Sequence, residues 1–119
     1  MILEPASIRQ IARQEVQASV ADGTAVIVDA LSPMSFAVSH LPHAVNMPPE
    51  RVDELAERLI PDRTTQVVVY CSSETCDASI LAAKRLAELG YANVSQYAGG
   101  KRDWVEAGLP LEGGGIPRS

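Results

Sequence analysis

Two cysteines stand five residues apart in the segment "VVVYCSSETCDAS", and the first of them directly follows a run of β-forming residues. Cys71 ends the run Val67–Tyr70, and small polar residues then lead into an alanine-rich amphipathic stretch. In open α/β sheets, ligands bind beyond the carboxyl ends of the strands, where helix N-termini present unpaired N–H groups. Backbone amides from about residues 72–78 would lower the pKa of a thiol there from about 8.5. We therefore predict that Cys71 is a catalytic nucleophile.

The segment after Cys71 supplies the candidate substrate-binding groups. Carboxylates near a thiolate raise its pKa, so Glu74 and Asp77 oppose the amides. Because exposed carboxylates are screened, we still expect a net lowering of the Cys71 pKa. The serine and threonine hydroxyls can bind an anion, although Ser79 can instead cap the following helix. The predicted binding loop consists of Ser72, Ser73, Glu74, Thr75, Cys76, Asp77, Ala78 and Ser79.

Both cysteines also have simpler interpretations. Cys71 can be a small apolar residue that completes a buried strand, and Cys76 can lie near it through helical spacing alone. Alternatively, Cys76 is a resolving thiol that attacks an oxidised or sulfur-loaded Cys71 and forms a reversible disulfide. We expect no metal, since the C-x4-C spacing lacks a second cysteine pair and His40 and His43 lie in a different segment.

Composition and charge exclude several classes of function. The 119 residues are 46% hydrophobic and 21% charged, which predicts one globular domain with a largely aliphatic core. The net charge of −5 argues against nucleic acid or an anionic membrane as partner. The apolar runs are far shorter than the roughly 20 residues of a membrane span. The segment "MILEPASIRQ" lacks the features of a signal peptide, so we expect a cytoplasmic protein with reduced cysteines.

The elements that must position Cys71 alternate between strand and helix. Strands are predicted at about 26–28, 44–46, 67–70 and 93–97. Helices are predicted at about 12–21, from Pro33 after a Ser32 N-cap, at 49–60, at 79–89 and around Trp104. This alternation predicts a small α/β domain whose parallel sheet has helices on both faces. We place the domain at residues 1–112 and a flexible tail at 113–119.

Four motifs, in this order along the chain, resemble the rhodanese (sulfurtransferase) family. The segment "VIVDA", ending in Asp29, is similar to the family's first strand and its aspartate, and "HLPHAVNMP" is similar to H-[IL]-P-G-A-x-N-[IL]-P. The segment "VVVYC" places Cys71 where the family has its persulfide-forming cysteine. The closing "GGKRDWVEAGLPLEG" matches G-G-x-x-x-W-x-x-x-G-[LY]-P and is the most specific of the four. The resemblance implies a central, mostly parallel five-stranded sheet flanked by helices on both faces.

The resemblance also implies a reaction. The cysteine thiolate would attack the outer sulfur of a donor such as thiosulfate, become a persulfide, and pass the sulfur to cyanide or another thiol, including a protein thiol. No cofactor is expected. Two alternatives remain: a non-catalytic module of the same fold that binds a partner or metabolite, and a phosphatase or arsenate reductase of the related dual-specificity type. The phosphatase or arsenate reductase would need an arginine six residues after the cysteine, and position 77 is Asp.

The loop departs from the common family pattern C-R-[ST]-G-x-R-S. Alignment on the following helix makes it longer and leaves Ala78 where the arginine usually stands, so no cationic residue lies between Cys71 and Ser79. An anionic donor would therefore meet Glu74 and Asp77 with less help from arginine.

For the other residues of these motifs we expect supporting or structural roles. Leu31 stands where the family has an arginine, and His43 replaces a glycine. Lys101 and Arg102 follow the Gly99–Gly100 turn and can supply positive charge if that turn faces the site. We expect Asp29 to hold loops by hydrogen bonds rather than act as a base, His40 to be structural, and Trp104 to lie in the core.

Overall fold

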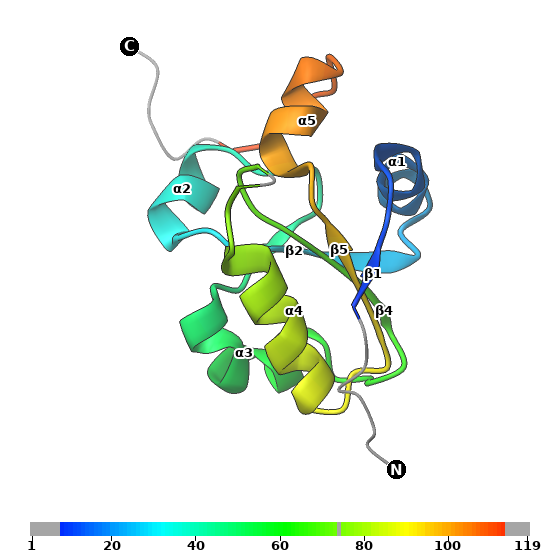
Figure 1. Ribbon diagram of the computed structural model, residues 1–119, viewed down its shortest axis with the longest axis vertical. Coiled ribbons are helices and arrows are strands. Elements are labelled where there is room, and N and C mark those ends of the chain that lie inside the picture. Colours follow the sequence, from blue (N-terminus) through cyan, green and yellow to red (C-terminus); the bar gives the residue numbers. More distant parts are fainter. Residues whose placement is uncertain (1–7, 74, 114–119) are drawn as a thin grey trace.

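Residues 8–73 and 75–113, which the computed structural model describes, form an α/β fold around a sheet of five parallel strands (Figure 1). The strand order is β1-β5-β4-β2-β3, and every neighbouring pair is parallel. All carboxyl ends therefore meet at one edge of the sheet. The strands are β1 (Arg9–Gln10), β2 (Ala25–Asp29), β3 (Val45–Asn46), β4 (Gln66–Tyr70) and β5 (Asn93–Tyr97).

Helices cover both faces of this sheet, as the sequence predicts. On one face lie α3 (Val52–Leu59) and α4 (Ala78–Glu88), and on the other lie α1 (Arg13–Asp22) and α5 (Gly100–Glu106). The short helix α2 (Pro33–Val38) packs through Phe36 against the second of these layers. The predicted flanked sheet is thereby confirmed.

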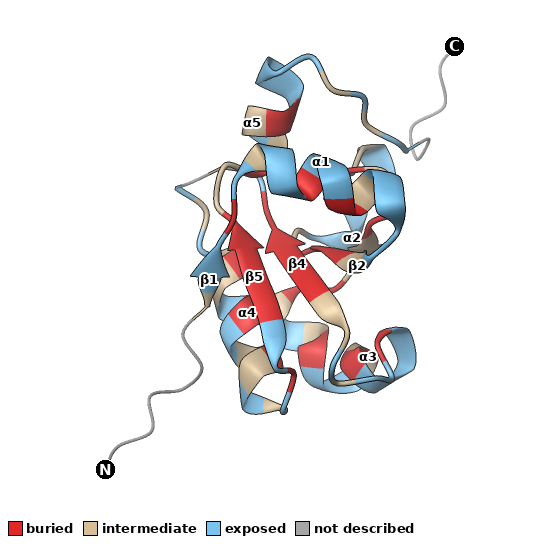
Figure 2. Cartoon of the chain, turned by 90° about the vertical axis from the view of Figure 1, so that its right-hand side faces the viewer, coloured by how far each residue is buried: buried red, intermediate tan, exposed pale blue. Residues whose placement is uncertain are grey.

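The central strand β4 is apolar on both sides because both of its faces are covered. Val67 and Val69 pack with α3 and α4, whereas Val68 and Tyr70 pack with α1 and α5. Figure 2 shows β4 and β5 buried along most of their lengths. A continuous apolar run, rather than an alternating one, is what a strand in this position requires.

The ends of several helices follow the expected capping chemistry. The hydroxyl of Ser32 accepts a hydrogen bond from the Ser35 amide at 3.2 Å, and Pro33 occupies the first turn of α2. After α4 the chain turns through Gly90, whose φ of 100° lies in the region that favours glycine. The helix expected from residue 49 begins with the 3-10 turn η1 (Pro49–Arg51), and regular α3 starts only at Val52.

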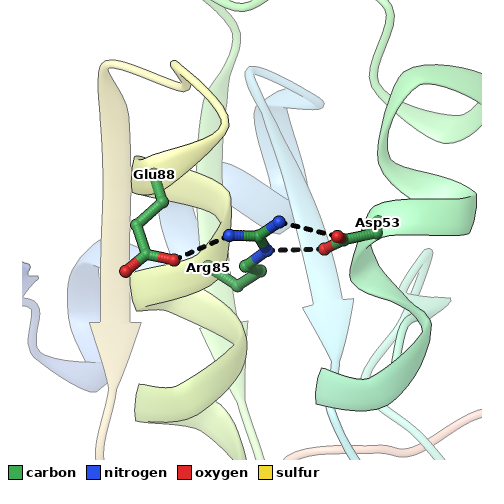
Figure 3. A network of polar contacts seen from close by, with 3 residues as sticks. All are labelled: Asp53, Arg85 and Glu88. Carbon is green, nitrogen blue, oxygen red and sulfur yellow. Dashed lines mark hydrogen bonds and ion pairs between the residues drawn. The ribbon is translucent and has the colours of Figure 1, made fainter.

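An exposed ion-pair network joins the two helices on one face of the sheet. Arg85 of α4 forms a bidentate pair with Asp53 of α3, at 2.6 Å for each nitrogen, and also contacts Glu88 at 2.9 Å (Figure 3). This pairing lowers the pKa of Asp53 through the hydrogen bonds from Arg85. Because all three groups are exposed, the network contributes little to the free energy of unfolding.

One strand was missing from the sequence prediction. The edge strand β1 comprises only Arg9 and Gln10, both exposed, and pairs with Ser95 and Gln96 of β5. Two polar residues carry neither the length nor the apolar pattern of a strand. The implied number of five strands is confirmed, although the sequence located only four of them.

The segment after α5 returns to the carboxyl edge of the sheet. His40 and Glu112 form an antiparallel bridge with two backbone hydrogen bonds of 2.8 Å. The ring of His40 stacks on Phe36 with centroids 3.8 Å apart, which agrees with its expected structural role. Apart from Gly113, the predicted tail lies outside the described residues.

His43 occupies a backbone conformation that favours glycine, with φ of 67°. This explains why the pattern similar to "HLPHAVNMP" has a glycine at that position. None of the helices in the described ranges has the length and hydrophobicity needed to cross a membrane.

Candidate active site

Cys71 begins a loop at the carboxyl end of β4 and is buried, with 1% of its surface exposed. Its main chain is fixed from the side of α5: the Lys101 amide donates to the Cys71 carbonyl at 2.9 Å, and the Arg102 amide donates to the Ser72 carbonyl at 2.8 Å. These two bonds set the direction in which the loop leaves the strand.

Gly100 makes this approach of α5 to the loop possible. Its φ is 65°, and a Cβ atom added there would lie 2.5 Å from the carbonyl oxygen of Cys71. No real Cβ tolerates such a contact with backbone, and L side chains rarely adopt this φ. The glycine of the closing motif is thus required by the position of Cys71 itself.

The sulfur of Cys71 is surrounded by a mixture of acceptors and donors. Its Sγ lies 3.3 Å from the Ser79 Oγ, 3.3 Å from the carbonyl oxygen of Cys76 and 3.9 Å from the carbonyl oxygen of Ser73. Burial raises the pKa of the Cys71 thiol, and its hydrogen bond with Cys76 raises it further. The hydroxyl and amide of Ser79 act in the opposite direction, but the net pKa is above its ordinary value.

The predicted lowering of the Cys71 pKa is therefore wrong for this conformation. The amides of Ser72 and Ala78, which were expected to lower the pKa of Cys71, lower that of Cys76 instead. Burial by itself raises the pKa of Cys76, but hydrogen bonds from the Cys71 thiol and from the Ala78 and Ser72 amides bring it below its ordinary value. In this loop Cys76 therefore loses its proton more readily than Cys71.

Ser79 is held in place by a chain of side-chain hydrogen bonds that the sequence analysis did not identify. Gln96 of β5 donates from Nε2 to the Ser79 Oγ at 2.9 Å, and Gln10 of β1 donates to the Gln96 Oε1 at 3.0 Å. Since Gln96 fills one acceptor position of the hydroxyl, Ser79 can direct its own hydrogen to the Cys71 sulfur. The available signal was a glutamine inside the buried strand "NVSQY", where a polar residue needs a partner.

The remaining loop residues lie around this pair in different ways. Ser73 and Thr75 share a hydrogen bond of 3.0 Å between their hydroxyls, and the Cys76 amide donates to the Ser73 carbonyl at 3.1 Å. Asp77 is exposed and its carbonyl accepts from the Leu81 amide, while Ala78 begins α4. The predicted site residue Glu74 lies outside the described residues.

Lys101 and Arg102 do follow a turn that faces the loop, but their side chains diverge. The Arg102 guanidinium pairs with Glu106 at 3.1 Å, and the Lys101 ammonium reaches the Ser39 hydroxyl at 3.4 Å. Beside the loop lies a hollow of about 250 Å³ whose lining includes Arg102 but not Cys71. Its lining residues are Ser73, Thr75, Gly99, Arg102, Asp103 and Glu106.

Asp29 is fully buried and acts on the backbone, as expected. Its carboxylate accepts from the Tyr70 hydroxyl at 2.6 Å and from the Leu31 amide at 2.8 Å, and Tyr70 in turn accepts from the Leu41 amide at 2.9 Å. Burial raises the pKa of Asp29 although these hydrogen bonds and the positive charge of Lys101 lower it. Asp29 therefore ties the segments after β2 and α2 to the strand that carries Cys71.

The other expectations concern metal binding and Trp104. Within residues 8–73 and 75–113, no three His, Cys, Asp or Glu side chains gather in a way that could hold a metal ion. Trp104 is buried in the core, and its Nε1 donates to the Pro110 carbonyl at 2.8 Å, so its predicted core position is confirmed.

Fold and site together define a class of protein: a small α/β domain with a cysteine loop at the carboxyl edge of a parallel sheet. The chain belongs to the family of the rhodanese-like domain, whose family model matches residues 12–107. The predicted family is thus confirmed.

Similar proteins include known sulfurtransferases. Thiosulfate:glutathione sulfurtransferase of Saccharomyces cerevisiae is 32% identical over 98 residues, which cover 73% of this chain and 69% of the yeast protein. Thiosulfate sulfurtransferase PspE of Escherichia coli is 32% identical over 76 residues, covering 64% of this chain and 70% of that protein. The crystal structure of thiosulfate sulfurtransferase from Pseudomonas aeruginosa is 30% identical with a TM-score of 0.77, covering 89% of this chain and 20% of that one.

Proposed function

We propose that this protein is a sulfurtransferase that carries sulfane sulfur as a persulfide on Cys71. The donor is thiosulfate or a similar small sulfur compound, and the acceptor is cyanide or a thiol, including the thiol of a protein. The observation that carries the proposal is the contact of the Cys71 sulfur with the Ser79 hydroxyl at the carboxyl end of β4. The names of two relatives, in yeast and Escherichia coli, support the class of reaction.

The reaction has two displacement steps. The Cys71 thiolate attacks the outer sulfur of thiosulfate, a bond forms between the two sulfurs, and sulfite leaves with the electron pair of the broken S–S bond. An acceptor thiolate then attacks the terminal sulfur of the persulfide, and the Cys71 thiolate leaves. A covalent intermediate divides one difficult transfer into two easier ones.

The residues around Cys71 have separate roles in these steps. Ser79 donates its hydroxyl hydrogen to the thiolate, which favours the charged form both before loading and after transfer. The Ser79 amide acts in the same direction. Arg102 is a candidate to attract an anionic donor, since it lines the hollow together with Ser73 and Thr75. The expected cytoplasmic location and the absence of nucleic acid and membrane from its partners stay predictions.

The test is the intact mass of the Cys76→Ser protein after exposure to thiosulfate, because Cys71 is then the sole cysteine of the chain. We expect a gain of about 32 Da that cyanide removes as thiocyanate. A matched protein that also carries Cys71→Ser should gain no mass. Equal mass gain in both proteins, or none in either, would contradict the proposal.

A second candidate is a non-catalytic binding module of the same fold. It is favoured by the burial of Cys71, by its raised pKa and by the absence of Cys71 from the lining of the hollow. The same mass measurement separates the two candidates, since a binding module takes up no sulfur. No contact of the described residues favours the phosphatase or arsenate reductase, because Asp77 stands where that chemistry needs arginine.

A further inference from the structure

The loop brings the backbone of Cys76 against the sulfur of Cys71. The Cys71 Sγ lies 3.3 Å from the carbonyl oxygen of Cys76, and each of the two thiols shifts the pKa of the other. The bond from the Cys76 amide to the Ser73 carbonyl, at 3.1 Å, closes a turn that brings residue 76 back over residue 71. Both cysteines are free thiols in this arrangement.

The two cysteine sulfurs differ in burial and in pKa. The sulfur that attacks should be the more readily ionised of the two, and the sulfur that carries the persulfide should be the more buried. Cys71 is buried, whereas Cys76 is half-buried. Amides of Ser72 and Ala78 donate to the Cys76 sulfur and stabilise its thiolate. Thiolates, rather than thiols, attack S–S bonds.

We propose that Cys76 is a resolving thiol that converts the Cys71 persulfide into a disulfide and releases sulfide. This inference rests on the proposed function, because it needs Cys71 to be loaded with sulfur. It adds a second activity: the protein releases the sulfur as hydrosulfide instead of only handing it to an acceptor.

The step balances without an external oxidant. The Cys76 thiolate attacks the Sγ of Cys71, a Cys71–Cys76 bond forms, the bond to the terminal sulfur breaks, and that sulfur leaves as HS⁻ with its proton and the electron pair. The sulfane sulfur is reduced while the two cysteine sulfurs become a disulfide. A second turnover then needs two equivalents of a thiol, or one dithiol, to reduce the disulfide by exchange.

The position of Cys76 favours this attack over reaction with solvent thiols. The inner sulfur of a Cys71 persulfide would remain buried beside Ser79 and Cys76, whereas an external acceptor attacks the terminal sulfur. A thiolate held on the same short loop has an effective concentration that free thiols do not match.

The experiment compares fully reduced wild-type, Cys76→Ser and Cys76→Ala proteins after thiosulfate exposure without oxygen and removal of excess donor. For the wild type we expect a mass about 2 Da below the reduced protein, a Cys71–Cys76 disulfide in its peptide map, and about one equivalent of released sulfide. Both variants should keep the gain of about 32 Da at least about tenfold longer. Thermal melting checks that the two variants remain folded.

Several outcomes would overturn the inference, and they differ from failure of the proposed function. Wild-type protein that keeps its added sulfur as long as both variants would show that Cys76 does not resolve the persulfide, while the sulfurtransferase stands. Added sulfur mapped to Cys76 would show a relay instead of a disulfide. A disulfide that forms equally without thiosulfate would show simple oxidation. If no protein gains or releases sulfur, both proposals fall.

Discussion

At Cys71 burial and hydrogen bonding act in opposite directions on the charge of a single sulfur. Burial and the contact with Cys76 favour the neutral thiol, while the hydroxyl and amide of Ser79 favour the thiolate. A neutral resting thiol is protected from indiscriminate oxidation, because oxidants and alkylating agents react with thiolates. Ser79 is then the group that the reaction depends on when charge develops on the sulfur.

Replacement of Ser79 by Ala should slow sulfur transfer and shift its pH dependence. Loss of a hydrogen bond to a charged group costs about 1.5–3 kcal/mol, so kcat/KM for thiosulfate should fall about 10- to 100-fold. Because a donor that favours the thiolate is removed, the pKa of Cys71 should rise, and the rate should recover only at higher pH. The measurement is the pH profile of thiocyanate formation.

Ser95→Ala provides the matched control for this variant. Ser95 is a buried serine of β5 directly before Gln96, and its side chain points to the opposite face of the sheet from the Gln96 side chain. This control should leave the pH profile unchanged. An identical shift in both variants would mean that the Ser79 effect is a general loss of packing.

At the scale of elements, backbone hydrogen bonds couple α5 to the loop that follows β4. The Lys101 and Arg102 amides hold the carbonyls of Cys71 and Ser72, and Gly100 allows the close approach. The cysteine loop is therefore positioned by a helix that follows it in sequence by nearly thirty residues. Sequence changes in α5 can alter the site without touching a substrate.

Replacement of Gly100 by Ala should destabilise the protein and displace the Cys71 loop. A left-handed conformation alone costs an alanine about 1–2 kcal/mol, and the clash with the Cys71 carbonyl adds to this. The control is Gly108→Ala, since Gly108 has φ of 80° and an added Cβ there meets nothing within 4 Å. Urea unfolding should show a clearly larger loss for Gly100→Ala, together with a loss of activity that Gly108→Ala lacks. Equal losses in the two variants would contradict the role assigned to Gly100.

The sequence was sufficient to locate β4 and Cys71 but not the edge strand β1. The run Val67–Tyr70 is apolar at every position, and its β-branched residues with flanking turn signals favour a strand covered on both faces. That run also fixed the place of Cys71 at the end of β4. The edge strand β1 could not be found, because Arg9 and Gln10 are exposed and owe their conformation to pairing with β5.

The electrostatics of the loop could not be predicted because they depend on its path. Sequence shows that amides follow Cys71, but not which thiol they stabilise as a thiolate. The Ser72 and Ala78 amides lower the pKa of Cys76, and the Ser79 amide lowers that of Cys71. The contact between Gln96 and Ser79 joins two residues that are 17 positions apart, so no local pattern reveals it. Long-range partners of this kind need the folded chain.

At the scale of the whole molecule, Asp29 joins three segments at the carboxyl edge of the sheet. Its raised pKa means that the unfolded chain releases this proton more readily than the folded one. The resulting contribution to stability is fully present below the unfolded pKa, near 3.8, and is lost as pH rises through the higher folded pKa.

Comparison with Asp29→Asn should reveal this contribution. As pH rises from the unfolded pKa of Asp29 through its folded pKa, the free energy of unfolding of the wild type should fall relative to that of the variant, which has no proton to lose there. Above the folded pKa the difference should become constant. The measurement is urea unfolding across this range, and a difference that does not vary with pH would contradict the raised pKa.

The bridge between His40 and Glu112 has a practical consequence for the design of fusion proteins. It brings Gly113 against Ser39, and the Ser39 hydroxyl in turn contacts Lys101 of α5. A fusion partner that displaces Glu112 would break both backbone hydrogen bonds to His40, next to the residue that contacts Lys101.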